Sequence, residues 1–164
     1  RPDRYELTDG LKRLEAYQLQ LDPSYKKVPL HNNNKVFLWV DDRCLQAMID
    51  TGASINVIPD HILHTLNPQC VMNMRNSRVK QCYLANNDVV GVSSMVDVCI
   101  KLGNSFHVIT FHILSTGTDI ILGLEFLQHT QCIFDCMAKM LYVRRMNTTP
   151  EDDAAQLLTM TRPG

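Results

Sequence analysis

The stretch Ile49-Asp50-Thr51-Gly52-Ala53-Ser54 places a carboxylate where an apolar strand gives way to a glycine-containing loop. Residues 44–49 alternate between two faces, as a strand does, so the strand ends directly before Asp50. Gly52 permits a tight backbone path, and the amide groups of such a loop can point at the carboxylate. A carboxylate held rigidly can work beside a second one, because the two share a proton and the ionised member activates water. The alternative is a turn with no chemistry, since Asp and Gly are common in turns.

A second stretch, Asp119-Ile120-Ile121-Leu122-Gly123-Leu124, combines a β-branched apolar run with a glycine and the start of an apolar helix. By itself it also fits a core strand that ends at a glycine. Together with the loop around Asp50, it favours a strand that backs a catalytic loop.

The chain around these stretches predicts a mostly β domain over residues 35–145. Short segments that alternate between apolar and polar residues are separated by turn residues such as Asp41-Asp42 and Gly103-Asn104. We expect strands at 36–40, 44–49, 95–102, 106–113, 132–135 and 140–144, and short helical segments at 60–66 and 124–129.

The two flanks differ from this domain. Leucines at three- and four-residue steps predict an amphipathic helix over about 9–20, so residues 1–30 are expected to form an N-terminal helical extension. Residues 146–164 are expected to form a flexible tail. The chain begins Arg1-Pro2 rather than with Met, and we expect it to be a fragment of a longer protein.

The composition of the 164 residues excludes several classes of protein. Hydrophobic residues make up 45% of the chain, which is enough for a packed core, so global disorder is excluded. A formal net charge of −1 indicates no nucleic-acid or membrane partner, and no apolar run approaches the roughly 20 residues of a membrane span. Without a visible secretory signal, we expect a cytoplasmic or nuclear protein.

The six cysteines are spread without a disulfide framework, which favours reduced thiols. Two groups have spacings that could bind zinc, namely His61 and His64 near Cys70, and His129 with Cys132 and Cys136. Neither contains a paired Cys-x-x-Cys. A zinc-dependent binding domain is therefore the weakest of the functional hypotheses, and we expect no metal.

The order of motifs along residues 35–144 resembles that of the retropepsin-like aspartic proteases, the single-lobed family of retroviral and retrotransposon proteases and their cellular relatives. It is most similar to the DNA-damage-inducible-protein-1 type and to Ty3/gypsy-like elements, because Gly123 is followed by Leu124-Glu125 and not by the Arg of lentiviral enzymes. The resemblance implies a closed, single-lobed β-barrel with one short helix near its C-terminal side, to which this chain adds an N-terminal helix. The motifs are the active-site loop (49–54), the strand after it (56–59), the flap (83–91), the segment around Gly123 (119–126) and the closing strands (131–143).

The resemblance also implies an activity, an aspartic-type endopeptidase, and a role for each motif. Asp50 would be the catalytic carboxylate, one from each subunit of a homodimer, and Thr51 beside Gly52 would hydrogen-bond across the dimer beneath the pair. A peptide or protein substrate would lie extended between flap and floor. No metal or organic cofactor is called for, and the enzyme could also act within a retroelement polyprotein. The implied substrate-binding residues are Ala53, Ser54, Leu84, Ala85, Asn86, Asn87, Asp88, Ile121, Leu122 and Gly123.

Two departures from the family pattern keep a second hypothesis open. At the flap tip, Asn86-Asn87-Asp88 replaces a glycine-containing turn, so the hairpin is expected to be stiffer. Ser54 and Ile55 stand where lentiviral enzymes carry two acidic residues that contact the substrate backbone. The alternative is a catalytically weak or inactive module that uses the fold for peptide binding or dimerisation. Since the chain has one Asp-Thr-Gly loop where two-lobed aspartic proteases have two, any active site needs a second copy.

Overall fold

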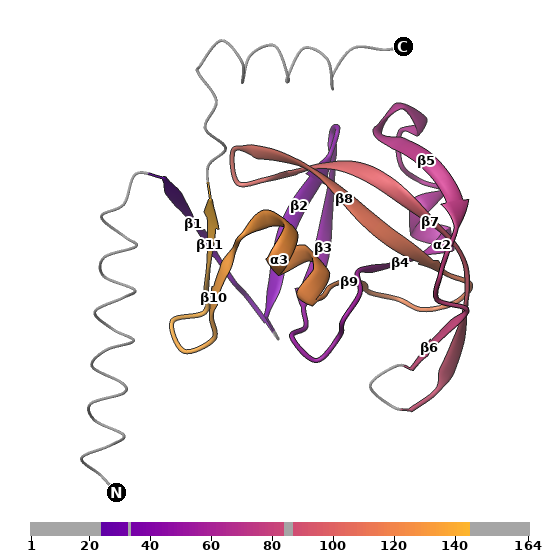
Figure 1. Ribbon diagram of the computed structural model, residues 1–164. Coiled ribbons are helices and arrows are strands. Elements are labelled where there is room, and N and C mark those ends of the chain that lie inside the picture. Colours follow the sequence, from indigo (N-terminus) through magenta and orange to yellow (C-terminus); the bar gives the residue numbers. More distant parts are fainter. Residues whose placement is uncertain (1–23, 33, 84–86, 145–164) are drawn as a thin grey trace, which may run out of the picture.

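The computed structural model describes residues 24–32, 34–83 and 87–144, which form two β-sheets and short helices (Figure 1). The smaller sheet has the order β1 (Tyr25–Pro29), β11 (Met140–Arg144), β10 (Ile133–Asp135). The larger has the order β2-β3-β9-β4-β8-β7-β5, and β6 pairs with β7. Its strands are β2 (Lys35–Val40), β3 (Arg43–Ile49), β4 (Val57–Pro59), β5 (Val71–Asn76), β6 (Gln81–Tyr83), β7 (Val89–Leu102), β8 (Ser105–Leu114) and β9 (Ile120–Leu122), and the helices are α2 (Asp60–Leu63), the 3-10 turn η1 (Pro68–Cys70) and α3 (Leu124–Thr130).

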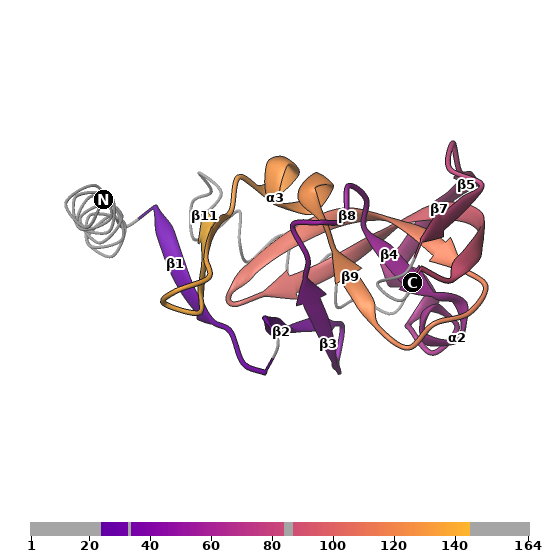
Figure 2. The ribbon, with the colours of Figure 1, turned by 90° about the horizontal axis from the view of Figure 1, so that it is seen from below.

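The larger sheet closes on itself. The long strand β7 pairs with β8 over most of its length and also meets β2, where Trp39 lies opposite Lys101. This contact joins the two ends of the path β2-β3-β9-β4-β8-β7, which makes a small barrel. Figures 1 and 2 place the three-stranded sheet at one end of the molecule and β5 with the adjoining part of β7 at the other. The mostly β class expected from the sequence is confirmed.

The core follows from the alternation of side chains along these strands. In β2, Val36, Leu38 and Val40 are buried, while Phe37 and Trp39 between them are exposed. The inward side chains of the barrel strands pack with Phe126 of α3 into one large cluster. A second, smaller cluster lies beside it and consists of Val57, Val90, Val92 and Leu114.

Several predicted elements are confirmed, with modest differences in length. The strands expected at 36–40, 44–49, 106–113 and 140–144 and the helix at 124–129 correspond to β2, β3, β8, β11 and α3. The helix expected at 60–66 ends at Leu63, after one turn. The strand expected at 95–102 begins earlier, at Val89, because its first residues pair with β6. The predicted helix at 9–20 and the tail at 146–164 lie outside the described residues.

Three strands were not expected from the sequence. Tyr25–Pro29, at the end of the expected N-terminal extension 1–30 and beyond the helix predicted within it, forms the strand β1. Its five residues show little alternation and end in a proline, so their conformation comes from pairing with β11, where Val28 lies opposite Leu141. The residues of β5 and β6 are mostly exposed, and these strands likewise depend on pairing with β7.

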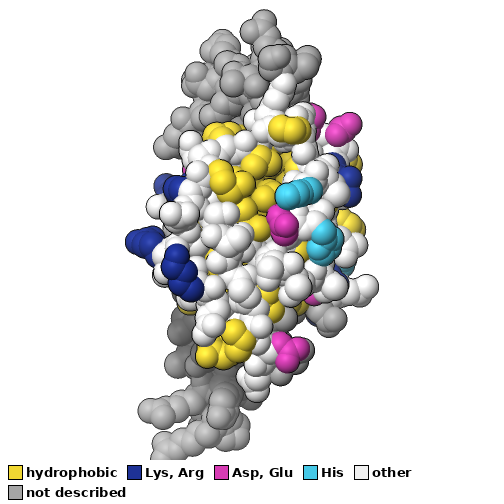
Figure 3. All heavy atoms as spheres, turned by 90° about the vertical axis from the view of Figure 1, so that its right-hand side faces the viewer, with side chains coloured by type: hydrophobic (Ala, Val, Ile, Leu, Met, Phe, Trp, Pro, Cys, Tyr) yellow, Lys and Arg dark blue, Asp and Glu magenta, His cyan; other side chains and the backbone are white. Residues whose placement is uncertain are grey.

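One face of the molecule carries side chains of different kinds in different places. Figure 3 shows the face on the right-hand side of Figure 1, with apolar side chains at its centre, basic ones on one edge, and histidine and acidic ones on the other. Within the described residues, no helix is long and apolar enough to cross a membrane. The six cysteines all lie in the described part of the chain, and all are free thiols.

Candidate active site

The loop that follows β3 holds the Asp50 carboxylate by a backbone amide. Strands β3 and β9 run parallel, with Ile49 opposite Leu122, and the Asp50 N–H donates to the Leu122 carbonyl at 3.0 Å. The chain then turns back, so that the Ala53 N–H donates to the Asp50 carbonyl at 3.1 Å. Within this turn, the Gly52 N–H donates to Asp50 Oδ1 at 2.9 Å. The loop thus orients a carboxylate at its exposed end, as the sequence of the loop predicts.

Gly123 lies so close to the backbone of the loop that a residue with a side chain would not fit there. A Cβ atom at this position would lie 2.4 Å from the Ile55 carbonyl oxygen and 2.6 Å from that of Ala53. The first residues of α3 then bind the loop directly, since the Leu124 N–H donates to the Ala53 carbonyl at 2.9 Å and the Glu125 N–H to the Ser54 carbonyl at 3.1 Å. The glycine is therefore needed for close approach between the two motifs.

Asn56 ties the loop to the rest of the barrel, and the sequence analysis did not identify it. Its side chain is buried and makes three hydrogen bonds. Its Oδ1 accepts from the Gly123 N–H at 2.9 Å and the Phe126 N–H at 3.1 Å, while its Nδ2 donates to the Thr110 carbonyl at 3.1 Å. In the sequence, Asn56 is a single polar residue before the apolar strand 57–59, and this pattern indicates only where the strand starts.

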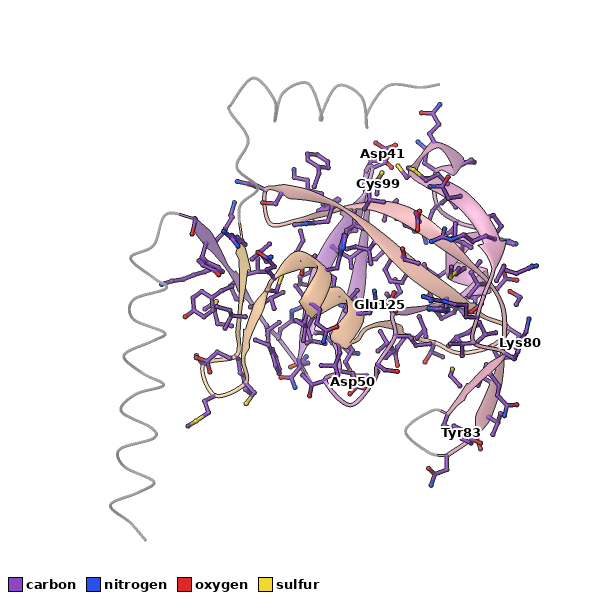
Figure 4. The ribbon with its side chains drawn as sticks, viewed as in Figure 1. Asp41, Asp50, Lys80, Tyr83, Cys99 and Glu125 are labelled. Atoms are coloured by element: carbon purple, nitrogen blue, oxygen red, sulfur yellow. The ribbon has the colours of Figure 1, made fainter. Side chains whose placement is uncertain are left out.

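The loop forms one wall of a cavity of about 690 Å³. Strand β6 lies on the other side, and Figure 4 shows Tyr83 at the end of that strand, across from the loop that carries Asp50. The two charged residues among those that line the cavity are Asp50 and Asp119. The lining residues are Met48, Asp50, Gly52, Ala53, Ser54, Ile55, Val57, Val79, Gln81, Cys82, Tyr83, Leu114, Gly117, Thr118, Asp119 and Ile121.

The residues that the sequence assigned to the site fall into three groups. Five of them line the cavity, namely Asp50, Gly52, Ala53, Ser54 and Ile121. Thr51 is exposed on the loop, and Asn87 and Asp88 are exposed before β7, whereas Leu122 is buried and lies with Gly123 behind the loop. Leu84, Ala85 and Asn86 lie outside the described residues. The sequence analysis did not assign Val79, Gln81, Thr118 or Asp119 to the site, although Asp119 opens the predicted motif 119–126. These four residues come from two segments, 79–81 and 118–119, which the fold places at the cavity.

Two of the residues with zinc-like spacing, His64 and Cys132, contact other side chains. His64 lies 3.5 Å from the carboxylate of Asp60, which is one helical turn before it. Cys132 accepts a hydrogen bond from the Thr130 hydroxyl at 2.9 Å, and burial raises the pKa of its thiol to about 11, which disfavours the thiolate that a metal needs. Across the described residues, no three His, Cys, Asp or Glu side chains are grouped so that they could hold a metal ion.

The chain has similarities to known proteins. Residues 38–129 match the family model described as "gag-polyprotein putative aspartyl protease". No curated protein matches the sequence. Among solved structures, the retroviral protease-like domain of Ddi1 from Leishmania major is 16% identical, with a TM-score of 0.53 over 77% of this chain and 98% of that one. This likeness shows a shared fold.

Two further solved structures are similar at lower TM-scores. EIAV protease, complexed with the inhibitor HBY-793, is 18% identical with a TM-score of 0.49, over 61% of this chain and 89% of its own. A retropepsin-like aspartic protease from Rickettsia conorii is 14% identical with a TM-score of 0.46, over 74% and 91%.

Proposed function

This chain belongs to the gag-polyprotein aspartyl protease family, and we propose that it is an aspartic endopeptidase whose active site forms between two copies, with one Asp50 from each. The family match and the shared fold confirm the resemblance to retropepsin-like aspartic proteases. The observation that carries the proposal is the Asp50 carboxylate, held by the Gly52 amide at the wall of the large cavity.

The requirement for a second copy follows from the number of carboxylates. Hydrolysis by this chemistry needs two carboxylates about 3 Å apart, which share one proton and titrate as a unit. The other acidic residue at the cavity, Asp119, has its carboxylate 3.4 Å from the hydroxyl of Thr118 and comes from the loop before β9. Because the Asp50 loop presents its tip outward, a second copy can place an identical loop against it.

The proposed mechanism uses only water and the two carboxylates. The ionised Asp50 removes a proton from the water as the water oxygen attacks the carbonyl carbon of the scissile bond, and the protonated Asp50 donates its proton to the carbonyl oxygen. The carboxylic acid that gained the proton of the water then donates it to the leaving nitrogen as the C–N bond breaks. The other carboxylate takes back a proton from a hydroxyl of the tetrahedral intermediate, which becomes the product carboxylic acid, and the shared proton is restored. The exposed hydroxyl of Thr51 is free to brace the partner's loop beneath the pair.

The cavity supports an extended peptide as the substrate. Its lining includes both apolar side chains, such as those of Val57, Val79 and Ile121, and the small residues Gly52 and Ala53 of the loop. A peptide in β-conformation pairs its backbone with a sheet edge and directs alternate side chains into pockets. We propose that β6 and the start of β7 form the flap over this peptide, and that Ser54, Asn87 and Asp88 contact it.

The family name also supports a context for the reaction. A protease of this family is encoded as part of a gag polyprotein, so we propose that the natural substrate is a retroelement polyprotein. Action in the cytoplasm or nucleus stays a prediction from the sequence.

One observation favours the second candidate function, peptide binding without efficient cleavage. Asn87, in the proposed flap tip, has a φ of +67°, which a glycine would adopt without strain. A stiffer flap would slow the opening and closing that turnover requires. Binding of a peptide without its cleavage, equally by the wild type and Asp50→Asn, would favour this candidate.

The experiment that tests the proposal is cleavage of a peptide library from acid to neutral pH. The wild type is compared with Asp50→Asn and with Asp42→Asn, an equal change at the exposed turn between β2 and β3. We expect cleavage by the wild type and by Asp42→Asn, with a maximum between two titrations, and none by Asp50→Asn. Cleavage that survives in Asp50→Asn, or a folded wild-type dimer that cleaves nothing at any pH, contradicts the proposal.

A further inference from the structure

A chain of three polar side chains, two buried and the third, Glu125, partly exposed, lies outside the catalytic loop. The Ser77 hydroxyl lies 2.7 Å from His112 Nδ1, and His112 Nε2 lies 3.8 Å from the carboxylate of Glu125. Ser77 and His112 are each 4% exposed. The three residues come from the segment between β5 and β6, from β8 and from α3, so the chain crosses three elements that are distant in sequence.

The partners of Ser77 and His112 define which atom donates in each of their hydrogen bonds. The Glu125 carboxylate that faces Nε2 can only accept, so a neutral His112 ring carries its proton on Nε2. Nδ1 then accepts the Ser77 hydroxyl proton, and the Ser77 hydroxyl oxygen accepts from the Val79 N–H at 3.0 Å. Burial lowers the pKa of His112; Glu125 opposes this and the nearby Arg78 adds to it. A neutral His112 ring is consistent with a proton on Nε2 and an unprotonated Nδ1 that accepts from Ser77.

Serine, histidine and a carboxylate in a row also occur where serine is a nucleophile. Here that role is excluded by position, because Ser77 is buried and its hydroxyl is engaged on both sides by Val79 and His112. The group therefore holds parts of the fold together and does not react with a substrate.

The parts that it holds together are the two walls of the cavity. Val79 lines the cavity and packs against the small apolar cluster at the start of β7, and the adjacent Lys80 carbonyl accepts from the Val92 N–H at 2.9 Å. On the other side, the His112 N–H donates to the Asn56 carbonyl at 2.8 Å, and the Asn56 side chain binds the backbone behind the catalytic loop. Continuous contacts thus lead from the base of the β6–β7 arm, defined as residues 77–83 and 87–92, to the loop of Asp50.

We propose that His112 is a positioning residue, which fixes the base of the β6–β7 arm relative to the loop of Asp50 and so sets how tightly the arm holds a peptide. This inference rests on the proposed function, since it concerns the same cavity. It does not require His112 to touch the peptide.

The test compares two buried histidines of the same strand. His107 lies on β8 as well and is 7% exposed, but its Nε2 has no hydrogen-bond partner among the described residues. For His112→Leu we expect KM for a cleaved peptide to rise about tenfold, with kcat changed by less than about twofold, because the peptide is held less well but the carboxylates are intact. His107→Leu should leave both constants near their wild-type values.

Two further variants separate positioning from a general loss of packing. In His112→Asn, the carboxamide can still accept the Ser77 hydroxyl proton near the position of Nδ1, so most of the wild-type KM should return. Ser77→Ala removes the hydroxyl at a small change of volume, and it should raise KM even if His112→Leu does not fold. Equal KM values for wild type and folded Ser77→Ala would overturn the inference, as would an equal rise in His107→Leu.

Hydrogen exchange tests the inference independently of catalysis. If the protein cleaves nothing, the proposed function fails, but the amides of β6 and of Val89–Gly91 can still be followed. We expect these amides to exchange at least about tenfold faster in Ser77→Ala than in the wild type, with the amides of β2 and β3 unchanged. Unchanged exchange in the arm would overturn the inference.

Discussion

The buried carboxamide of Asn56 gives the sharpest test of how the loop is held. Replacing Asn56 by alanine leaves the N–H groups of Gly123 and Phe126 and the carbonyl of Thr110 without this partner, in a site where Asn56 is 2% exposed. The Phe126 N–H keeps a second partner, the Gly123 carbonyl at 3.1 Å, so the loss falls mainly on the Gly123 N–H and the Thr110 carbonyl. Each buried polar group left unsatisfied costs about 1–3 kcal/mol, and partial relaxation reduces the sum, so we expect a loss of about 2–4 kcal/mol in the free energy of unfolding. That is a large share of the roughly 5–15 kcal/mol that stabilises a domain.

The assay is equilibrium unfolding in urea at one fixed protein concentration, because association of two copies would otherwise shift the midpoint. The matched control is Asn67→Ala. Asn67 also makes two side-chain hydrogen bonds, to the Gln69 N–H and to Asp41, but both are exposed to solvent. We expect this control to cost about 1 kcal/mol. If Asn56→Ala costs no more than Asn67→Ala, the claim that buried hydrogen bonds of Asn56 secure the loop is refuted.

Three further predictions follow from the same structure. Gly123→Ala should lower the free energy of unfolding in urea by at least about 2 kcal/mol, because its Cβ would lie 2.4 Å from a carbonyl oxygen. Gly91→Ala should lower it much less, because its Cβ would lie 3.6 Å from the Ser115 hydroxyl. Burial lowers the pKa of His107 and His112, so the unfolded chain binds more protons than the folded one as pH falls. The free energy of unfolding should therefore decrease as pH drops through about 6.5, and His107→Leu should make its change with pH smaller between pH 5 and 8. With a pKa raised to about 11, Cys132 should resist a thiol reagent at pH 8 in a mass-spectrometric time course, whereas the exposed Cys44 and Cys136 are labelled first.

The sequence predicted those parts of the fold whose pattern is local. Alternation in 36–40 and 44–49 and the turn at Asp41-Asp42 identify a hairpin, and the loop 49–54 identifies the carboxylate that the Gly52 amide holds. Strands β1, β5 and β6 were missed because their residues do not alternate clearly, and their conformation depends on partners distant in the sequence.

The candidate site was predicted only in part, for a related reason. The motif 119–126 predicted a strand behind the Asp50 loop but not that Asp119 lines the cavity, and Val79 reaches the cavity because the barrel brings its segment there, which no local pattern encodes. Asn56 and His112 matter through hydrogen bonds to backbone groups far along the chain, and a polar residue within an apolar strand does not reveal its partner. Burial, which distinguishes these residues from ordinary polar ones, becomes visible only in the structure.

The central claim is that two copies of Asp50 form one active site, and cleavage by mixed dimers tests it most directly. Wild type and Asp50→Asn are unfolded together, refolded in varied proportions at constant total concentration, and assayed on the same peptide. If each site needs both carboxylates, activity follows the square of the wild-type fraction, so an equal mixture retains about one quarter of the wild-type rate. A rate of about one half at that point would mean that each chain works alone, which contradicts the account.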